Sequence, residues 1–95
     1  MTEIKEANKR IRILRDNQAL SRAKFAEKVG LKPKTLENLE LGIQEVYNWH
    51  LDAIAKNFPK FEYWLHTGKV LPESGQISPE LEEKHRDSEK EGKVI

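Results

Sequence analysis

The residues that could carry enzymatic or metal chemistry in this 95-residue chain are few and widely spaced. Cysteine is absent, which excludes a disulfide scaffold, a thiol nucleophile and a cysteine-ligated metal centre. His50, His66 and His85 stand too far apart to place metal ligands on one element, so we expect surface or capping histidines. Asp52 and Glu62 are isolated carboxylates without an obvious acid–base partner. The sequence therefore predicts no enzyme, no metal site and no cofactor.

Charge is abundant but nearly balanced, with 17 Lys and Arg against 16 Asp and Glu. This balance excludes a strongly basic nucleic-acid-binding arm and a strongly acidic solvating chain. Positive charge is concentrated in residues 1–42, whereas residues 69–95 carry more acidic than basic side chains. No apolar run is long enough to span a bilayer, and the first residues lack the apolar core of a signal peptide. We expect a cytoplasmic protein that does not enter the membrane.

Helical spacing accounts for nearly all apolar positions, which predicts an all-α domain of five helices. The first is expected over residues 2–17, where one apolar stripe recurs at steps of three and four. That stripe consists of Ile4, Ala7, Ile11 and Leu14. A second helix over residues 22–29 is capped by Ser21 and ended by Gly30. A third, over residues 33–41, starts with a proline and ends at Gly42.

Two more helices are expected, over residues 46–57 and between Pro59 and Gly68. Their predicted core residues are Trp49, Leu51, Ile54, Ala55, Phe61, Trp64 and Leu65. From Lys69 the composition changes, and a helix start at Ser78-Pro79-Glu80 is followed almost only by charged residues. Such a helix has no apolar face to pack, so this tail is expected to be mobile or to fold against a partner. The predicted organisation is a domain over 1–68 and a charged tail over 69–95.

The most informative stretch is residues 22–41, in which seven positions suit two helices that cross through a tight turn. These positions are Phe25, Ala26, Val29, Gly30, Leu31, Leu36 and Leu39. A small side chain at Ala26 allows the helices to approach closely, and Gly30 permits the turn between them. The larger apolar side chains fix the crossing against the first helix. This arrangement predicts a helix-turn-helix unit over residues 21–42.

The unit resembles the helix-turn-helix of the lambda-repressor-like (Cro/CI, Xre) family, and the resemblance extends from about Ile4 to Gly68. Its other marks are Ile11-Arg12-Ile13-Leu14-Arg15, Leu39-Glu40-Leu41-Gly42, Ile54-Ala55-Lys56 and Tyr63-Trp64-Leu65-His66-Thr67-Gly68. The resemblance implies a five-helix domain that binds double-stranded DNA through a recognition helix over residues 33–41. It also implies a bacterial or phage transcriptional regulator that acts as a homodimer on a roughly palindromic site.

Family positions can be carried onto this chain residue by residue. The implied base contacts are Pro33, Lys34 and Asn38, and the implied phosphate contacts are Ser21, Arg22 and Thr35. Lysine can donate to guanine, and asparagine can pair with adenine through two hydrogen bonds. The resemblance further implies a structural salt bridge between Arg15 and Glu40, which would tie the recognition helix to the first helix.

The chain also departs from the family pattern. Arg22 stands where glutamine is usual in the family, and Lys32 precedes Pro33 where a capping Ser or Thr is usual. After Gly42, Ile43-Gln44-Glu45 stand in place of Lys or Arg residues that hold phosphates. Phosphate contacts supply much of the affinity for DNA. The alternative is therefore a protein-interaction module that keeps the fold and binds DNA weakly. Under either reading the acidic tail is a candidate contact for a protein partner, and Leu41, Ile43 and Val46 either pack on the following helix or form a dimer contact.

Overall fold

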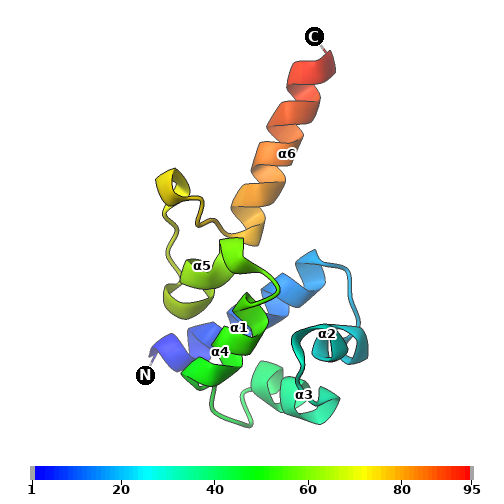
Figure 1. Ribbon diagram of the computed structural model, residues 1–95, viewed down its shortest axis with the longest axis vertical. Coiled ribbons are helices and arrows are strands. Elements are labelled where there is room, and N and C mark those ends of the chain that lie inside the picture. The colour runs from blue at the N-terminus through cyan, green and yellow to red at the C-terminus, as the bar shows by residue number, and fades with distance from the viewer. Residues whose placement is uncertain (1, 95) are drawn as a thin grey trace.

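Six α-helices and two short 3₁₀ turns make up residues 2–94, the part of the chain that the computed structural model describes (Figure 1). The α-helices are α1 (Thr2–Asn17), α2 (Arg22–Val29), α3 (Pro33–Leu41), α4 (Asn48–Ala55), α5 (Glu62–Thr67) and α6 (Pro79–Val94). The 3₁₀ turns are η1 (Pro59–Phe61) and η2 (Pro72–Ser74). These residues contain no β-strand, and Leu71 and Gln76 form an isolated bridge. The predicted all-α fold class is confirmed.

The predicted starts and stops of α2 and α3 are confirmed by their local geometry. Ser21 Oγ accepts a hydrogen bond from the Lys24 backbone N–H at 3.2 Å, which caps α2. Lys32 provides no side-chain cap, and Pro33 begins α3 at a position where a missing N–H leaves no bond unmade. Both helices end at glycines with φ of 77° and 76°, a left-handed conformation that side chains disfavour.

α4 is shorter than predicted, and its faces differ from those expected. Tyr47 has an extended backbone, so the helix begins at Asn48, and Val46 packs into the core from the preceding loop. Trp49, predicted to be buried, is 58% exposed, whereas the neighbouring His50 is fully buried. The reason is that positions 50, 51 and 54 share the helix face that meets the core, and position 49 lies outside it. A surface position for His50 was the wrong expectation, although its capping role is present.

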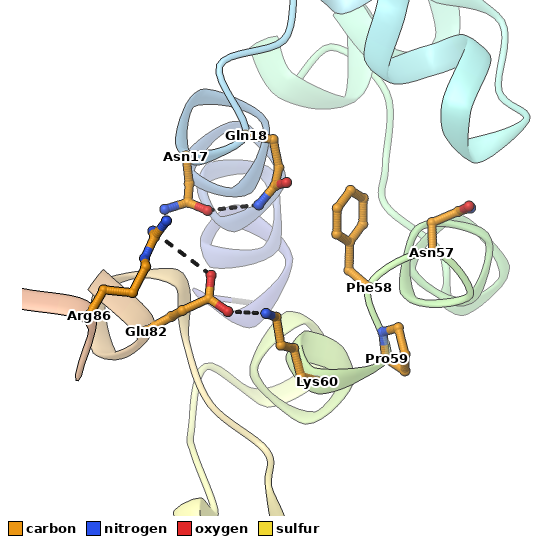
Figure 2. Close-up of a pocket in the computed structure, with 8 residues that line it drawn as sticks. All are labelled: Asn17, Gln18, Asn57, Phe58, Pro59, Lys60, Glu82 and Arg86. Carbon is orange, nitrogen blue, oxygen red and sulfur yellow. Dashed lines mark hydrogen bonds and ion pairs between the residues drawn. The ribbon is translucent and has the colours of Figure 1, made fainter. Parts of the chain in front are cut away.

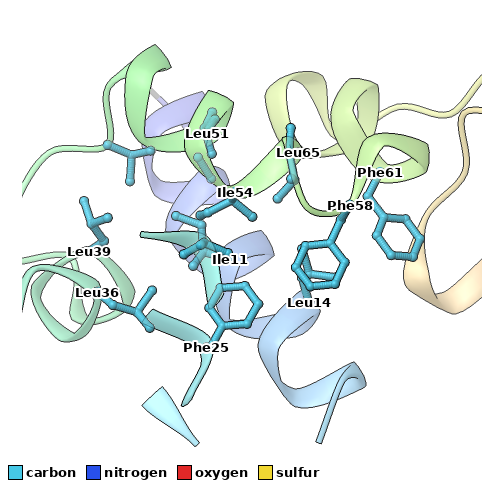
Figure 3. Packing of buried hydrophobic residues seen from close by; sticks show 14 of the residues in the cluster. Ile11, Leu14, Phe25, Leu36, Leu39, Leu51, Ile54, Phe58, Phe61 and Leu65 are labelled. Carbon is cyan, nitrogen blue, oxygen red and sulfur yellow. The ribbon is translucent and has the colours of Figure 1, made fainter. Parts of the chain in front are cut away.

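The hydrophobic core is arranged around α1, which contacts α3, α5 and the start of α6. Figure 3 shows Ile11 between Leu36 and Leu39 of α3 on one side and the side chains of α4 and α5 on the other. Phe25 stacks on Phe58 with ring centroids 5.8 Å apart. Trp64, Phe61 and Leu65 are buried as predicted, while the side chain of Ile4 lies outside the described residues.

Two polar side chains of α1 are buried and bind the ends of other helices. Asn8 donates from its side-chain amide to the carbonyl of Leu39 in α3. Arg10 donates from Nε to the carbonyl of Leu65 in α5 at 3.0 Å. The last carbonyls of a helix lack partners within it. Arg10 supplies a donor to the Leu65 carbonyl, and Asn8 adds a second donor to the Leu39 carbonyl, which also accepts the N–H of Gly42 at 3.3 Å.

The segment after Gly68 packs back on the domain before α6 begins. Val70 and Ile77 lie against the core, and Pro79 is fully buried. Gln76 accepts the backbone N–H of Tyr63 at 3.0 Å and donates to the carbonyl of Pro59 at 3.1 Å. The predicted boundary at residue 68 thus separates segments that are in contact. Beyond its first turns, α6 projects away from the other helices, on the side opposite α3 (Figure 1). None of the helices in residues 2–94 combines the length and the apolarity needed to cross a bilayer.

Candidate nucleic-acid interface

The turn between α2 and α3 holds the two helices in one fixed crossing. Leu31 donates its backbone N–H to the carbonyl of Ala26 at 2.9 Å, directly after the left-handed Gly30. Phe25 and Ala26 of α2 and Leu36 of α3 are completely buried. Since one face of α3 is committed to this packing, the residues on its opposite face are displayed to solvent.

The three candidate base-contacting residues lie on this open face of α3. Pro33 and Lys34 are exposed in its first turn, with 78% of the Lys34 side chain accessible. Asn38 is partly exposed one turn later, and residues four apart lie on the same side of a helix. Its carbonyl accepts the N–H groups of Ile43 and Gln44, which fixes the backbone where α3 closes. The structure therefore places the three residues on one continuous surface.

The candidate phosphate-contacting residues lie at the starts of α2 and α3. Ser21 is exposed at the N-cap of α2, and Arg22 and Thr35 are partly exposed. The first turn of α2 contains no acidic residue. Backbone N–H groups and the helix dipole make a helix N-terminus favourable for an anion such as phosphate.

An alternating chain of charges connects α1 to this open face. Arg15 donates from Nε and Nη2 to the two carboxylate oxygens of Glu40, at 2.7 and 3.0 Å. The ion pair expected between these two residues is therefore present. The Glu40 side chain is completely buried, only 13% of the Arg15 side chain is exposed, and the hydrogen bond to Glu40 raises the pKa of Arg15. Arg22 donates to the same carboxylate from Nε at 3.1 Å, a contact that the sequence did not predict.

The charge chain continues onto the exposed surface through Glu37. Its carboxylate accepts a hydrogen bond from Lys34 Nζ at 3.0 Å and lies 3.9 Å from Nη1 of Arg22. The hydrogen bond from Lys34, together with the charges of Lys34 and Arg22, lowers the pKa of Glu37. Two of the cations that would contact DNA are thus paired with an anion of the same surface.

His50 shapes the loop that follows α3, a role that its sequence position alone did not reveal. Its Nδ1 accepts the backbone N–H of Tyr47 at 2.9 Å, and its Nε2 has no hydrogen-bond partner among the described residues. The ring is covered by Trp49, with centroids 3.8 Å apart, and by Tyr47, at 5.8 Å. Burial lowers the pKa of His50, because the charged imidazolium is poorly solvated there.

Stability is expected to fall below about pH 6.5 because of His50. Its pKa in the folded state lies below the unfolded value, so the unfolded chain binds the proton more readily as the pH falls through this range. Protonation would also turn Nδ1 from an acceptor into a donor facing the N–H of Tyr47. His50→Asn keeps an acceptor and does not titrate. Urea unfolding at pH 7.5 and 5.5 should therefore show a smaller pH effect in this variant.

The exposed His85 supplies the control for this measurement. His85→Asn is expected to keep the pH dependence of the wild type, since it removes a histidine that lies on the surface of α6 and outside the core. An unchanged pH dependence in His50→Asn would show that His50 does not contribute to acid sensitivity.

An open groove of about 530 Å³ lies between the end of α1, the turn into η1 and the first turns of α6 (Figure 2). Lys60 and Arg86 on this groove both pair with Glu82, and Asn17 donates to Glu83 at 2.8 Å nearby. These charged groups form ion pairs and hydrogen bonds with one another, and the contacts across the groove attach α6 to the rest of the domain. Within the described part of the chain, no three His, Asp or Glu residues gather closely enough to hold a metal ion.

The candidate functional surface therefore consists of the exposed side of α3, the start of α2 and the loop after α3. Comparison of the sequence with protein-family models and with curated proteins finds no match.

Proposed function

We propose that this chain is a lambda-repressor-like DNA-binding protein that inserts α3 into the major groove of double-stranded DNA. The supporting observation is the fixed crossing of α2 and α3, which leaves Pro33, Lys34 and Asn38 together on an open face with Arg22 beside them. In helix-turn-helix proteins the N-terminal residues of the second helix contact base edges, and the first helix crosses the phosphate backbone.

In this proposal the exposed residues divide into readers of sequence and holders of the backbone. Lys34 donates to guanine, Asn38 pairs with adenine, and Pro33 makes apolar contact with a thymine methyl group. Ser21, Arg22 and Thr35 bind phosphates, assisted by the N-terminus of α2. The protein acts in the cytoplasm as a homodimeric transcriptional regulator, with half-sites about one helical turn apart.

The test is selection from a random pool of duplex DNA at several salt concentrations, followed by sequencing of the retained molecules. A recovered palindrome with a steep salt dependence is the expected result. Asn38→Ala is expected to relax preference at one base pair, with a discrimination loss of about 1–3 kcal/mol. Arg22→Ala is expected to weaken all sequences alike and to reduce the salt slope by about 0.9. Arg15 would still pair with Glu40 in that variant.

Wild-type binding by both variants would overturn the docking of α2 and α3 that is proposed here. A change in sequence preference for Arg22→Ala, without a change in salt slope, would instead show that Arg22 contacts a base and not a phosphate.

A protein-interaction module is the second candidate function. It is favoured by the pairing of Lys34 and Arg22 with Glu37, which reduces the positive charge offered to DNA. The segment after Gly42, which begins Ile43-Gln44-Glu45, also contains no Lys or Arg until Lys56. Retention of DNA only at the non-specific level, about 10⁻⁴ to 10⁻⁶ M at physiological salt, would support this candidate over the first.

A further inference from the structure

Large exposed apolar side chains are concentrated in one short segment. Six such residues occur in the described part of the chain: Ile13, Leu41, Ile43, Tyr47, Trp49 and Leu71. Four of them fall within residues 41–49, where α3 closes and α4 opens, with exposures of 54, 72, 53 and 58%. We call Leu41, Ile43, Tyr47 and Trp49 the 41–49 patch. An exposed apolar cluster of this kind is typical of a surface that binds a partner.

The two aromatic side chains of the patch are held in place by a buried histidine. The ring of His50 stacks on that of Tyr47 with centroids 5.8 Å apart, and it meets the ring of Trp49 at 3.8 Å. Nδ1 of His50 also accepts the backbone N–H of Tyr47, which fixes the chain that carries both rings. A surface that is already ordered loses little conformational entropy when it binds. Exposed indole and phenol rings attract cations, arginine most often.

The charged residues that lie next to the patch along the chain are acidic. Residues 35–55 contain no Lys or Arg. Glu37 and Glu40, in α3, are already paired with cations of α1, α2 and α3. Glu45 and Asp52 are exposed, and no Lys or Arg among the described residues lies within ion-pair distance of either carboxylate. The surface around the patch therefore carries two negative charges that the described part of the chain does not balance.

The two carboxylates border the aromatic residues and have neutral partners. Glu45 accepts a hydrogen bond from the hydroxyl of Tyr47, which raises the pKa of Tyr47. Asp52 lies 3.2 Å from Nε2 of His66. It follows Trp49 by three residues in α4, so the side chains of Asp52 and Trp49 are neighbours on the helix surface. A carboxylate offers about four acceptor positions, and a phenol or a neutral imidazole occupies only one of them. Each carboxylate therefore keeps room for the two parallel N–H groups of an arginine.

This charge decides among the partners that an apolar surface can take. A second copy related by a two-fold axis would bring its own two carboxylates to the contact, so like charges would face each other. The phosphates of DNA and of anionic lipids have the same sign and are repelled as well. A segment with positive charge among apolar side chains is attracted by the carboxylates and by the aromatic rings, and it covers the apolar area.

We infer that the 41–49 patch binds an apolar, arginine-containing segment of another protein. The apolar side chains of that segment pack on Ile43 and Trp49, and its guanidinium groups bind Glu45 and Asp52. An apolar centre with a charged rim is the usual arrangement of a protein–protein contact. The N-terminal end of α3 begins about 10 Å from Leu41 along the helix axis, so it stays open to DNA. The inference goes beyond the proposed function and does not rest on it.

Selection from a library of short random peptides displayed on phage tests this inference on the full chain. The wild type and Trp49→Ser serve as parallel targets, in the absence of DNA. Peptides enriched by the wild type but not by Trp49→Ser are expected to combine arginine with large apolar residues. Relative to the unselected library, these peptides should be enriched in arginine and depleted in Asp and Glu.

The most strongly enriched peptide, with a fluorescent label, then measures the contribution of each residue by anisotropy. Ile43→Ser and Trp49→Ser are expected to raise its dissociation constant at least about tenfold each. Glu45→Gln and Asp52→Asn keep an acceptor but lose the charge, and each should raise the constant about threefold and weaken its salt dependence. Controls that make the same changes outside the patch should stay within about twofold of the wild type. These controls are Ile13→Ser, Leu71→Ser and Glu73→Gln. Helix content and thermal midpoint of every variant establish that it is folded.

The inference is overturned if no peptide depends on Trp49, or if the enriched peptides carry no excess of positive charge. Binding of the peptide to Glu45→Gln and Asp52→Asn with the affinity and salt dependence of the wild type would also overturn it, because the carboxylates would then play no part. A wild-type chain that dimerises through the patch and enriches no peptide would assign the surface to a second copy instead. Failure of the proposed function leaves the result in place, since no step of the selection contains DNA.

Discussion

Replacing Glu40 by glutamine is expected to destabilise the domain by about 3 kcal/mol, because the substitution leaves the largely buried Arg15 without its main counter-charge. The Glu40 side chain is completely buried, and it accepts two hydrogen bonds from Arg15 and one from Arg22. Arg15 is too enclosed to recover full hydration after the change. For a domain of this size the loss corresponds to a fall in thermal midpoint of roughly 12–24 °C, measured by calorimetry or circular dichroism.

Two further variants test whether the stranded charge is the cause. Glu37→Gln removes a partly exposed partner of the same Arg22 and should change stability by no more than about 0.5 kcal/mol. The double variant Arg15→Met with Glu40→Leu removes the principal buried pair together and should regain much of the lost stability. A single Glu40→Gln variant with the stability of the wild type would show that the ion pair contributes nothing net to folding.

The second large effect is a gain of DNA affinity when Glu37 becomes glutamine. In the free protein the Glu37 carboxylate holds Lys34 at 3.0 Å and lies 3.9 Å from Arg22, so in the proposed complex a base competes with it for Lys34 and a phosphate competes with it for Arg22. Removing its charge is expected to tighten binding about tenfold near 150 mM salt. The slope of log K against log salt should steepen by about 0.9 for each phosphate gained. Fluorescence anisotropy with a labelled duplex over 50–300 mM salt measures both quantities.

Glu73→Gln is the matched control, since it makes the same change in net charge within η2, away from α3 (Figure 1). Only a small, long-range effect on affinity is expected from it, because charges farther apart than the Debye length are screened. Equal affinities and salt slopes for wild type and Glu37→Gln would mean that Lys34 and Arg22 do not reach DNA, which would favour the interaction-module candidate.

Local signals in the sequence were sufficient to locate most of the fold. Ser21, Gly30 and Gly42 act through the backbone of their own neighbourhood, so helix ends at these positions could be predicted without knowledge of the rest of the chain. The stripe along α1 and the small Ala26 likewise express simple packing rules. Trp49 was predicted incorrectly because its large apolar side chain suggested a core position, whereas the face of α4 that meets the core contains positions 50, 51 and 54.

The candidate site was less accessible from sequence because its important contacts are long-range. The pairing of Arg15 with Glu40 was expected by resemblance, but the third member, Arg22, required the geometry of three helices. Asn8 was not identified as a core residue, since a polar residue in a stripe position gains meaning only from the Leu39 carbonyl it meets. The pairing of Lys34 with Glu37 can be predicted from their spacing of three residues on one helix, but the contact of Glu37 with Arg22 in another helix cannot.

The two buried side chains of α1 have a consequence for how the molecule comes apart. Asn8 and Arg10 are two residues apart on one helix, yet they donate to carbonyls in α3 and α5, two helices separated by the twenty residues 42–61. Detaching α1 would remove the Arg10 donor from the Leu65 carbonyl and the Asn8 donor from the Leu39 carbonyl at once, although the Leu39 carbonyl would keep the N–H of Gly42. Local opening of α3 alone is therefore costly, and the five helices before α6 should exchange their amide hydrogens as one cooperative unit. The surface formed by α2 and α3, as part of such a unit, keeps its shape until the whole domain unfolds.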